Sequence, residues 1–192
     1  MLFNSLDFAI FLPIVFLLYW FVAQKNLKLQ NALIVVASYV FYGWWDWRFL
    51  SLIIFSTVVD YLIGQKLRTE EKQSKRKVLL WTSIIVNLGF LGFFKYYNFF
   101  LENFVDVFSL FGMQINANSL NIILPIGISF YTFQTLSYTI DVYKKKLEPT
   151  QDFIAFSAFV CFFPQLVAGP IEKAKILLPQ MLIKRRFSFE QS

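Results

Sequence analysis

Five long stretches without a charged side chain constrain this 192-residue chain more than any other feature. Each is close to, or longer than, the roughly 17–25 residues that an apolar helix needs to cross the hydrocarbon core of a bilayer. One such stretch can form the core of a soluble protein, but a soluble chain of this size cannot bury five. The sequence therefore predicts a polytopic membrane protein. The five stretches are 8–24, 29–45, 78–94, 107–140 and 153–171.

The composition indicates the same class of protein. Hydrophobic residues make up 57% of the chain and aromatic residues 20%, with 25 phenylalanines and a mean hydropathy of +0.56. Soluble domains are usually about 45–50% apolar even when glycine is counted. The net charge of +6 comes from basic residues between the apolar stretches, where membrane proteins carry their orientation signals. It does not indicate a nucleic-acid partner.

The residues that several catalytic classes need are absent from the sequence. There is no histidine, which excludes a histidine general base, a Ser–His–Asp triad and a zinc site with histidine ligands. Cys161 is the only cysteine, so neither an intrachain disulfide nor a CxxC metal site can form. No glycine-rich phosphate loop is present. The residues predict no bound cofactor and no metal site.

The apolar stretches predict an all-α fold with about six membrane segments, one of them broken or re-entrant. No repeat or long linker divides the chain, so residues 1–192 are expected to belong to a single transmembrane domain. The opening MLFNSLDFAIFLP lacks the basic region and cleavage site of a signal peptide, so the first segment is expected to stay in place. The expected helices cover 8–23, 30–45, 49–64, 78–100, 122–142 and 152–170.

The distribution of lysine and arginine predicts an orientation. With these helices, 11 basic residues fall on one side of the membrane and only Arg48 and Lys95 on the other. Basic loops stay in the cytoplasm, so the N-terminus is predicted outside. Trp44, Trp45 and Trp47 crowd a helix end, where indole rings prefer the membrane interface. The 11 residues are Lys25, Lys28, Lys66, Arg68, Lys72, Lys75, Arg76, Lys77, Lys144, Lys145 and Lys146.

The stretch FFPQLVAGPI (162–171) interrupts this regular pattern. Pro164 and the pair Gly169–Pro170 break helical hydrogen bonding, and broken backbone at membrane depth persists only where protein or a water-filled cavity surrounds it. If 152–170 crossed the membrane, the five basic residues within 173–186 would lie outside. A segment that enters and returns keeps them in the cytoplasm. A partly re-entrant segment that lines something polar is therefore predicted.

One expected helix carries a polar stripe. Tyr131, Gln134, Tyr138 and Asp141 are spaced three, four and three residues apart, which places them on one helix face at 3.6 residues per turn. These side chains can hydrogen-bond to neighbouring helices, as polar residues in bundles do. They can also form the wall of a polar cavity. The residues alone leave both interpretations open.

Three further polar residues, Asp60, Asn87 and Lys95, lie within apolar segments. A carboxylate inside the membrane indicates a functional site by default. Gly64 and Lys66 follow Asp60 closely, however, so this carboxylate is expected to snorkel to the interface or to pair with a cation. The same structural interpretation is preferred for Asn87 and Lys95.

Four segments of the chain resemble the membrane-bound O-acyltransferase family. The longest are LPIGISFYTFQTLSYTIDVYKKKLEPT (124–150) and FVCFFPQLVAGPIEKAKILLPQM (159–181). The opening MLFNSLDFAIFLP and the segment ASYVFYGWWDWRFL (37–50) are similar to the bacterial alginate O-acetylase branch of that family. The four segments occur in the family's order, and the resemblance covers essentially the whole chain.

The resemblance implies a helical fold around a tunnel through the bacterial inner membrane. An acetyl group would pass from a cytoplasmic thioester donor such as acetyl-CoA to an exported polysaccharide such as alginate, often through a separate extracytoplasmic acetyltransferase. The family's catalytic histidine lies later in its members. The chain is therefore expected to be an N-terminal portion that lacks the catalytic residue and is inactive without its C-terminal half.

By motif match, the resemblance also implies residues that line the tunnel or the donor path, with Lys173 and Lys175 attracting an anionic donor. A transporter or flippase would also use broken helices and polar residues at the membrane midplane, and a non-catalytic membrane scaffold is a third interpretation. The implied lining residues are Pro125, Gly127, Tyr131, Gln134, Tyr138, Asp141, Phe163, Pro164, Gln165, Gly169 and Pro170.

Overall fold

The computed structural model of the protein describes residues 3–110, 125, 127–169 and 172–185. All regular secondary structure within these ranges is helical, which confirms the predicted all-α fold. The helices are α1 (Leu6–Leu17) with its π-helical extension η1 (Leu18–Val22), α2 (Leu27–Asp46), the 3-10 turn η2 (Trp47–Phe49), α3 (Leu50–Thr69), α4 (Gln73–Leu110), α5 (Ile128–Tyr143), α6 (Phe153–Cys161), α7 (Phe163–Ala168) and α8 (Ala174–Leu182).

Five of the six expected helices are present, with shifted ends. The expected helix over 122–142 begins only at Ile128, and residues 122–124 lie outside the described ranges. The expected segment over 152–170 is divided into α6 and α7, as its proline predicted. Helix α8 was not expected; it contains Pro179, a residue type that disfavours helix interiors.

Local signals explain where α5 and α6 begin. Asp152 Oδ1 accepts the backbone N–H groups of Ile154 and Ala155 at 2.9 Å and 3.0 Å, which the first turn of a helix cannot pair internally. Gly127 precedes α5 with a φ of 79°, a left-handed conformation that favours glycine. Both starts are therefore set by single residues of the local sequence.

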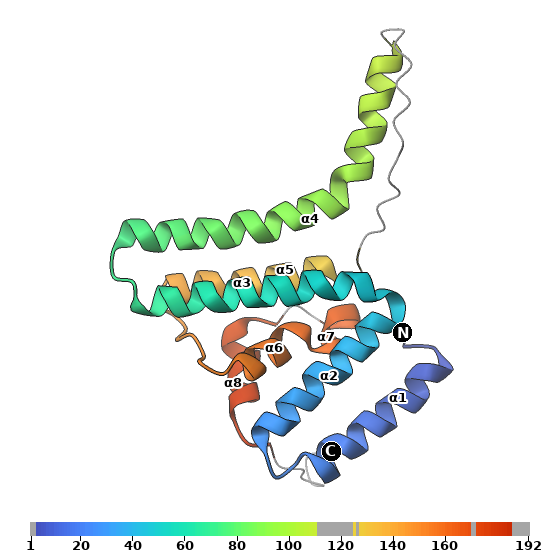
Figure 1. The fold of residues 1–192 in the computed structure, drawn as a ribbon, viewed down its shortest axis with the longest axis vertical. Helices are drawn as coiled ribbons and strands as arrows, with labels where there is room; N and C mark the ends of the chain where they lie inside the picture. Colours follow the sequence, from blue (N-terminus) through green and yellow to red (C-terminus); the bar gives the residue numbers. More distant parts are fainter. Residues whose placement is uncertain (1–2, 111–124, 126, 170–171, 186–192) are drawn as a thin grey trace.

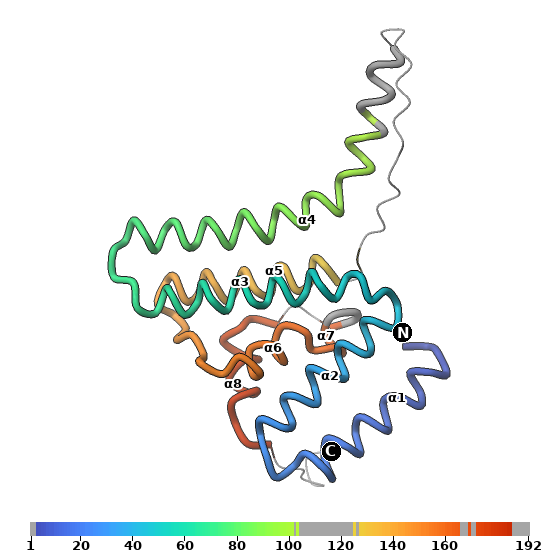
Figure 2. The backbone as a smooth tube through the Cα atoms, viewed as in Figure 1, coloured from blue at the N-terminus to red at the C-terminus, as the bar shows by residue number. Residues whose placement is uncertain are grey.

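The helices are arranged in layers (Figure 1). Helices α3 and α5 run side by side in the middle layer, and α4 packs on both of them from one face. On the other face lie α2, α6, α7 and α8, and α1 is outermost, beyond α2. The tube in Figure 2 follows α3 and α5 in parallel along most of their length. Helix α4 bends, and its last part leaves the bundle (Figure 1).

The centre of the bundle is the short helix α6, which is buried from Ala155 to Cys161. Phe156 and Phe159 are fully buried, and the ring of Phe156 lies 4.6 Å from that of Tyr138 on α5. Helix α6 contacts α2, α3, α5 and α8. Because apolar side chains gain little by leaving lipid, such packing stabilises the bundle mainly through van der Waals contact.

Two helical stretches, Leu27–Thr69 and Gln73–Leu101, are long and apolar enough to cross a membrane. The first contains α2 and α3, which turn at η2 (Figure 1), so each 20-residue half reaches about 30 Å, the thickness of the hydrocarbon core. Large apolar side chains such as Phe21 and Phe100 face outward, at 77% and 66% exposure. These are the features of a helical membrane protein, whereas the count of six membrane segments stays a prediction.

One arginine joins the ends of three helices. Arg76, near the start of α4, is only 4% exposed. Its Nη1 donates to the carbonyls of Leu67 and Glu70 at the end of α3, and its Nη2 donates to those of Val142 and Tyr143 at 3.3 Å and 2.8 Å. The last carbonyls of a helix lack internal donors and carry partial negative charge. Arg76 supplies both the missing hydrogen-bond donors and a compensating positive charge.

Substitution of Gly64 tests how closely α3 and α5 approach. An added Cβ would lie 2.5 Å from the hydroxyl oxygen of Tyr138 and 3.0 Å from its ring, so Gly64→Ala should lower the free energy of unfolding by about 1–3 kcal/mol. Gly89→Ala is the matched control, because no atom lies within 4 Å of its added Cβ, and it should stabilise α4 by up to about 1 kcal/mol. Denaturant titration in detergent micelles measures both, and equal effects would contradict the close packing.

Candidate functional site

The break between α6 and α7 is the centre of the candidate site. Phe162 leaves the helical conformation with a ψ of 103°, and Pro164, in the first turn of α7, has no backbone N–H. A continuous helix would join the N–H of Phe163 to the carbonyl of Phe159, and the break frees both groups. An unpaired backbone group in an apolar bundle costs several kcal/mol, so each of them needs a partner.

Two polar side chains from other helices supply these partners. Gln134 Nε2 on α5 donates to the Phe159 carbonyl at 2.7 Å, and the N–H of Phe163 donates to Ser38 Oγ on α2 at 3.2 Å. The break is therefore held by two different helices. Gln134 Nε2 also lies 3.4 Å from Oε1 of Gln165. The structure thus brings together the two glutamines that the resemblance implied on separate elements.

The chain is held by neighbouring helices both before α6 and after α8. Before α6, the carbonyl of Thr150 accepts a hydrogen bond from Gln65, near the end of α3, at 2.5 Å. After α8, Arg185 donates to the Tyr19 hydroxyl at 2.6 Å and to Asn31 Oδ1 at 2.8 Å, beside the turn between η1 and α2. The end of α3 and this turn lie at the left-hand ends of their helices (Figure 1). The re-entrant course of the segment stays a prediction.

The polar stripe of α5 is largely enclosed by protein. Tyr131, Gln134 and Tyr138 are at most 3% exposed, whereas Asp141, near the end of the helix, is half-buried. The Tyr138 hydroxyl has no hydrogen-bond partner among the described residues. The contacts of Gln134 fit the interpretation in which such side chains bind neighbouring helices. Their part in a tunnel wall stays a prediction.

The other implied residues are spread over helix ends and one exposed surface. Lys173 and Lys175 are exposed at the start of α8, so a soluble ligand can reach them. Gly169 ends α7, and its N–H donates to the carbonyl of Gln165 at 3.2 Å. Of the remaining residues, Pro125 and Phe163 are buried, Gly127 is half-buried, Pro164 is exposed, and Pro170 lies outside the described ranges.

A second polar cluster, between α3, α4 and α5, was not predicted as a site. Asp60 is fully buried and accepts hydrogen bonds from Ser83 Oγ at 2.5 Å, Asn87 Nδ2 at 2.8 Å and Thr139 Oγ1 at 3.3 Å. Within the described ranges no cation lies within ion-pair distance of it. The expectation that Asp60 snorkels or pairs with a cation is therefore wrong, because three neutral donors hold its carboxylate inside the bundle.

A repeated spacing could have revealed this cluster. Each of the three helices contributes two polar residues four positions apart, which share a helix face. Asn87 Oδ1 accepts hydrogen bonds from Ser56 Oγ at 2.6 Å and from Thr135 Oγ1 at 3.3 Å, and so links the pairs. The pairs are Ser56 and Asp60 on α3, Ser83 and Asn87 on α4, and Thr135 and Thr139 on α5.

Neither cluster presents a general base or a nucleophile to a substrate. Asp60 is sealed from solvent, Cys161 is buried in α6, and the groups that hold the helix break are neutral amides and hydroxyls. They satisfy backbone groups and fix the positions of helices. Chemically, the arrangement can provide a rigid wall without bulk water, but not proton transfer.

Replacing Gln134 tests whether its hydrogen bond to the Phe159 carbonyl stabilises the helix break. Gln134→Leu leaves the Phe159 carbonyl without its donor, which should cost about 1–3 kcal/mol of local stability. The buried thiol of Cys161 reports on this locally, since it is the only cysteine in the sequence. Its maleimide labelling rate should rise by roughly 5- to 150-fold. Phe133→Leu, at a neighbouring exposed position, should leave the rate unchanged, and equal rates in both variants would show that Gln134 does not hold the break.

The buried carboxylate is tested by two replacements. Asp60→Leu removes the acceptor for three interhelical hydrogen bonds and should destabilise the bundle by about 2 kcal/mol, at roughly 0.6 kcal/mol per bond. Asp60→Asn keeps the shape and one acceptor oxygen, so its loss should stay below about 1 kcal/mol. Unfolding in mixed micelles measures the free energy of unfolding of both variants. A loss for asparagine as large as that for leucine would show that the cluster needs the negative charge and not only an acceptor oxygen.

Comparison with known proteins matches the chain to O-acetyltransferases. It is 40% identical over 184 residues to the probable alginate O-acetylase AlgI of Pseudomonas aeruginosa, covering 94% of this chain and 34% of that protein. The AlgI of Azotobacter vinelandii is 38% identical over 186 residues, with coverages of 94% and 36%. The peptidoglycan O-acetyltransferase of Helicobacter pylori is 33% identical over 207 residues, with coverages of 94% and 38%. No family model and no solved structure matches.

These matches define the extent of the resemblance. The chain spans about a third of the length of the curated relatives that it matches. Within that third the similarity includes almost every part of the chain, at identities that confirm the resemblance implied by the sequence segments. Over nearly its entire length, the chain is similar to part of the alginate O-acetylase branch of the membrane-bound O-acyltransferase family.

Proposed function

We propose that this chain forms part of a bacterial membrane O-acetyltransferase that modifies a cell-surface polysaccharide. The observation that carries the proposal is similarity over 94% of the chain both to alginate O-acetylases and to a peptidoglycan O-acetyltransferase. The names of these relatives differ in the glycan and agree in O-acetyl transfer. A segment similar to both therefore serves the shared step, the handling of the acetyl group, rather than the recognition of one glycan.

The geometry suits one part of that reaction. Acetyl transfer from a thioester to a sugar hydroxyl needs a site without bulk water, because water competes as the acceptor. It also needs a general base that takes the proton of the hydroxyl. Helix α5 and the α6–α7 break, held by Gln134 and Ser38, supply a rigid wall. The sequence has no histidine, so in this proposal the base comes from another part of the complete enzyme.

The proposal places the basic turns in the cytoplasm and the N-terminus outside, in a multi-pass protein of the inner membrane. The α1–α2 turn, the α3–α4 turn and the end of α5 lie at the left-hand ends of their helices (Figure 1). These ends carry most of the lysines and arginines, whereas the right-hand ends carry few. Basic segments beside membrane helices stay in the cytoplasm, which supports this orientation.

In this orientation the acetyl donor approaches from the cytoplasmic side, which carries the basic turns. Lys173 and Lys175 are exposed, and Arg185, at the end of the same region, lies beside the turn before α2. These charges attract an anionic thioester such as acetyl-CoA over a screening length of roughly 8–10 Å. The polysaccharide acceptor, and a separate extracytoplasmic acetyltransferase if one assists, act on the opposite side.

Deletion and restoration of the gene test the proposal in the bacterium that carries it. Deletion should remove the alkali-released acetate from one cell-surface polysaccharide, and the intact gene should restore it without a change in the amount of polymer. In inside-out vesicles of the restored strain, Lys173→Gln/Lys175→Gln should raise the KM for acetyl-CoA by roughly three- to tenfold with kcat unchanged, most strongly at low salt.

Two outcomes would count against it. Unchanged acetylation with less exported polymer after deletion would favour a transporter over an acetyltransferase. Lys72→Gln/Lys77→Gln, at exposed basic positions near the start of α4, is the matched control for removed charge. If it raised the KM as much as the first pair, the role of Lys173 and Lys175 would be excluded, while the acetyltransferase assignment would stand.

A further inference from the structure

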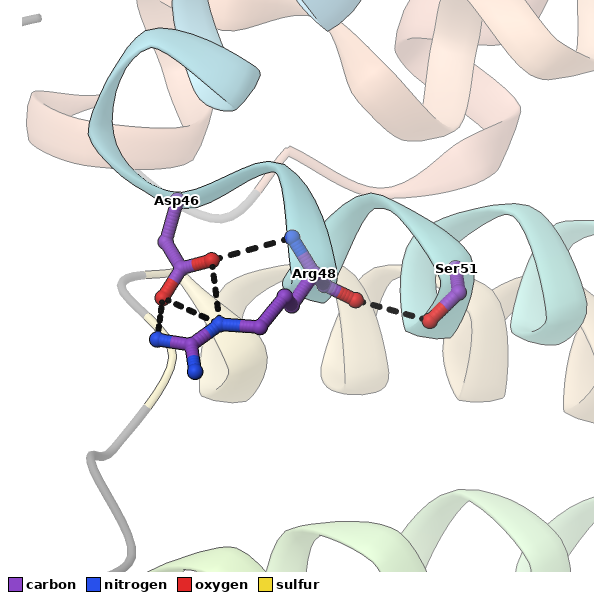
Figure 3. Close-up of polar contacts among 3 residues, drawn as sticks. All are labelled: Asp46, Arg48 and Ser51. Carbon is purple, nitrogen blue, oxygen red and sulfur yellow. Dashed lines mark hydrogen bonds and ion pairs between the residues drawn. The ribbon is translucent and has the colours of Figure 1, made fainter.

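The elbow between α2 and α3 presents an arginine whose backbone is held on both sides (Figure 3). Helix α2 ends at Asp46, and α3 begins at Leu50 after the short turn η2. Asp46 Oδ1 accepts the backbone N–H of Arg48 at 3.0 Å, and Ser51 Oγ donates to the Arg48 carbonyl at 2.8 Å. Two residues close in sequence, Asp46 and Ser51, therefore fix the backbone of Arg48.

The guanidinium group of Arg48 is oriented as well. Its Nε donates to both carboxylate oxygens of Asp46, at 3.0 Å and 3.2 Å, and its Nη2 donates to Oδ2 at 2.7 Å. Nη1 points away from Asp46 (Figure 3) and has no partner within the described ranges. The Arg48 side chain is 65% exposed, but that of Asp46 is only 12% exposed. An anion that approaches the elbow therefore meets the guanidinium before the carboxylate.

Three exposed tryptophans precede this arginine within four residues of the sequence. The exposed fractions of Trp44, Trp45 and Trp47 are 61%, 40% and 74%. The elbow joins two apolar helices of 20 residues each, a length that spans the hydrocarbon core. Their shared end therefore reaches the headgroup region, where indole rings prefer to lie. At that depth the outward edge of Arg48 is level with lipid phosphates.

A second cation lies in the part of α4 that packs beside the elbow. The ring of Phe49, the last residue of η2, lies 6.2 Å from the ring of Phe94, which immediately precedes Lys95. Lys95 and Arg48 are the two basic residues that the sequence assigns to this side. Arginine binds phosphate through paired N–H groups held in one plane. A fixed guanidinium with a free edge and exposed indoles, on a side with one further basic residue, match an anionic lipid headgroup.

We propose that Arg48, held by Asp46 and flanked by Trp44, Trp45 and Trp47, binds the phosphate of a phospholipid headgroup. The phosphate occupies the Nη1 edge of the guanidinium, and the indole rings contact the glycerol and upper acyl region of the same lipid layer. Binding fixes the depth at which the α2–α3 elbow lies in the bilayer. This role is independent of acetyl transfer.

Lipid binding to the complete purified protein tests the proposal, by native mass spectrometry and by thermal melting in detergent. Phosphatidylglycerol should bind and raise the melting temperature more than galactosyl diacylglycerol, which has the same chains and no phosphate. Arg48→Gln should weaken phosphatidylglycerol binding by roughly tenfold. Arg48→Lys keeps the positive charge but lacks the paired N–H groups in one plane, so it should lose part of the affinity. Lys28→Gln, an exposed cation at the far end of α2, should bind like the unchanged protein.

Several results would overturn it. Equal binding of the two lipids would exclude recognition of the phosphate. Full affinity in Arg48→Gln would exclude this arginine, and full affinity in Arg48→Lys would exclude the paired N–H geometry. Displacement of the lipid by inorganic phosphate at equal concentration would identify a site for free phosphate instead of a lipid. Melting of each variant without added lipid shows that a loss of binding does not come from misfolding.

Discussion

Every polar group inside this helical bundle needs a partner within the protein, because neither lipid tails nor packed phenylalanines can provide one. The structure meets this constraint in three places. Arg76 binds carbonyls at the ends of α3 and α5, Asp60 binds donors of α4 and α5, and Gln134 and Ser38 bind the groups freed between α6 and α7. These contacts join helices that apolar packing alone would leave free to slide.

The helix break has the largest consequence of the three. Once the carbonyl of Phe159 and the N–H of Phe163 are satisfied from outside their own helix, α6 and α7 can turn within the bundle without a penalty from unpaired backbone. The predicted re-entrant course would depend on these two hydrogen bonds. A short buried segment is thereby held between α2 and α5, and in the proposed function it serves as a wall.

The two sides of the bundle differ in chemistry. One side collects basic turns, the exposed lysines of α8 and the contacts of Arg185. The other side has few charges, three exposed tryptophans and an arginine oriented by Asp46. In the proposed arrangement the first side serves substrate delivery and the second positions the protein in the lipid.

The sequence by itself determined the all-α membrane class, most helix positions, the break at Pro164 and the lack of histidine chemistry, because these follow from composition and from local backbone rules. Only the tertiary structure decided what satisfies the break and where Asp60 lies. Gly64 and Lys66 beside Asp60 suggested an interface, but its partners Ser83 and Asn87 belong to another helix. Helical periodicity shows which residues share a face. It does not show which face of another helix they will meet, because that depends on packing between segments distant in sequence.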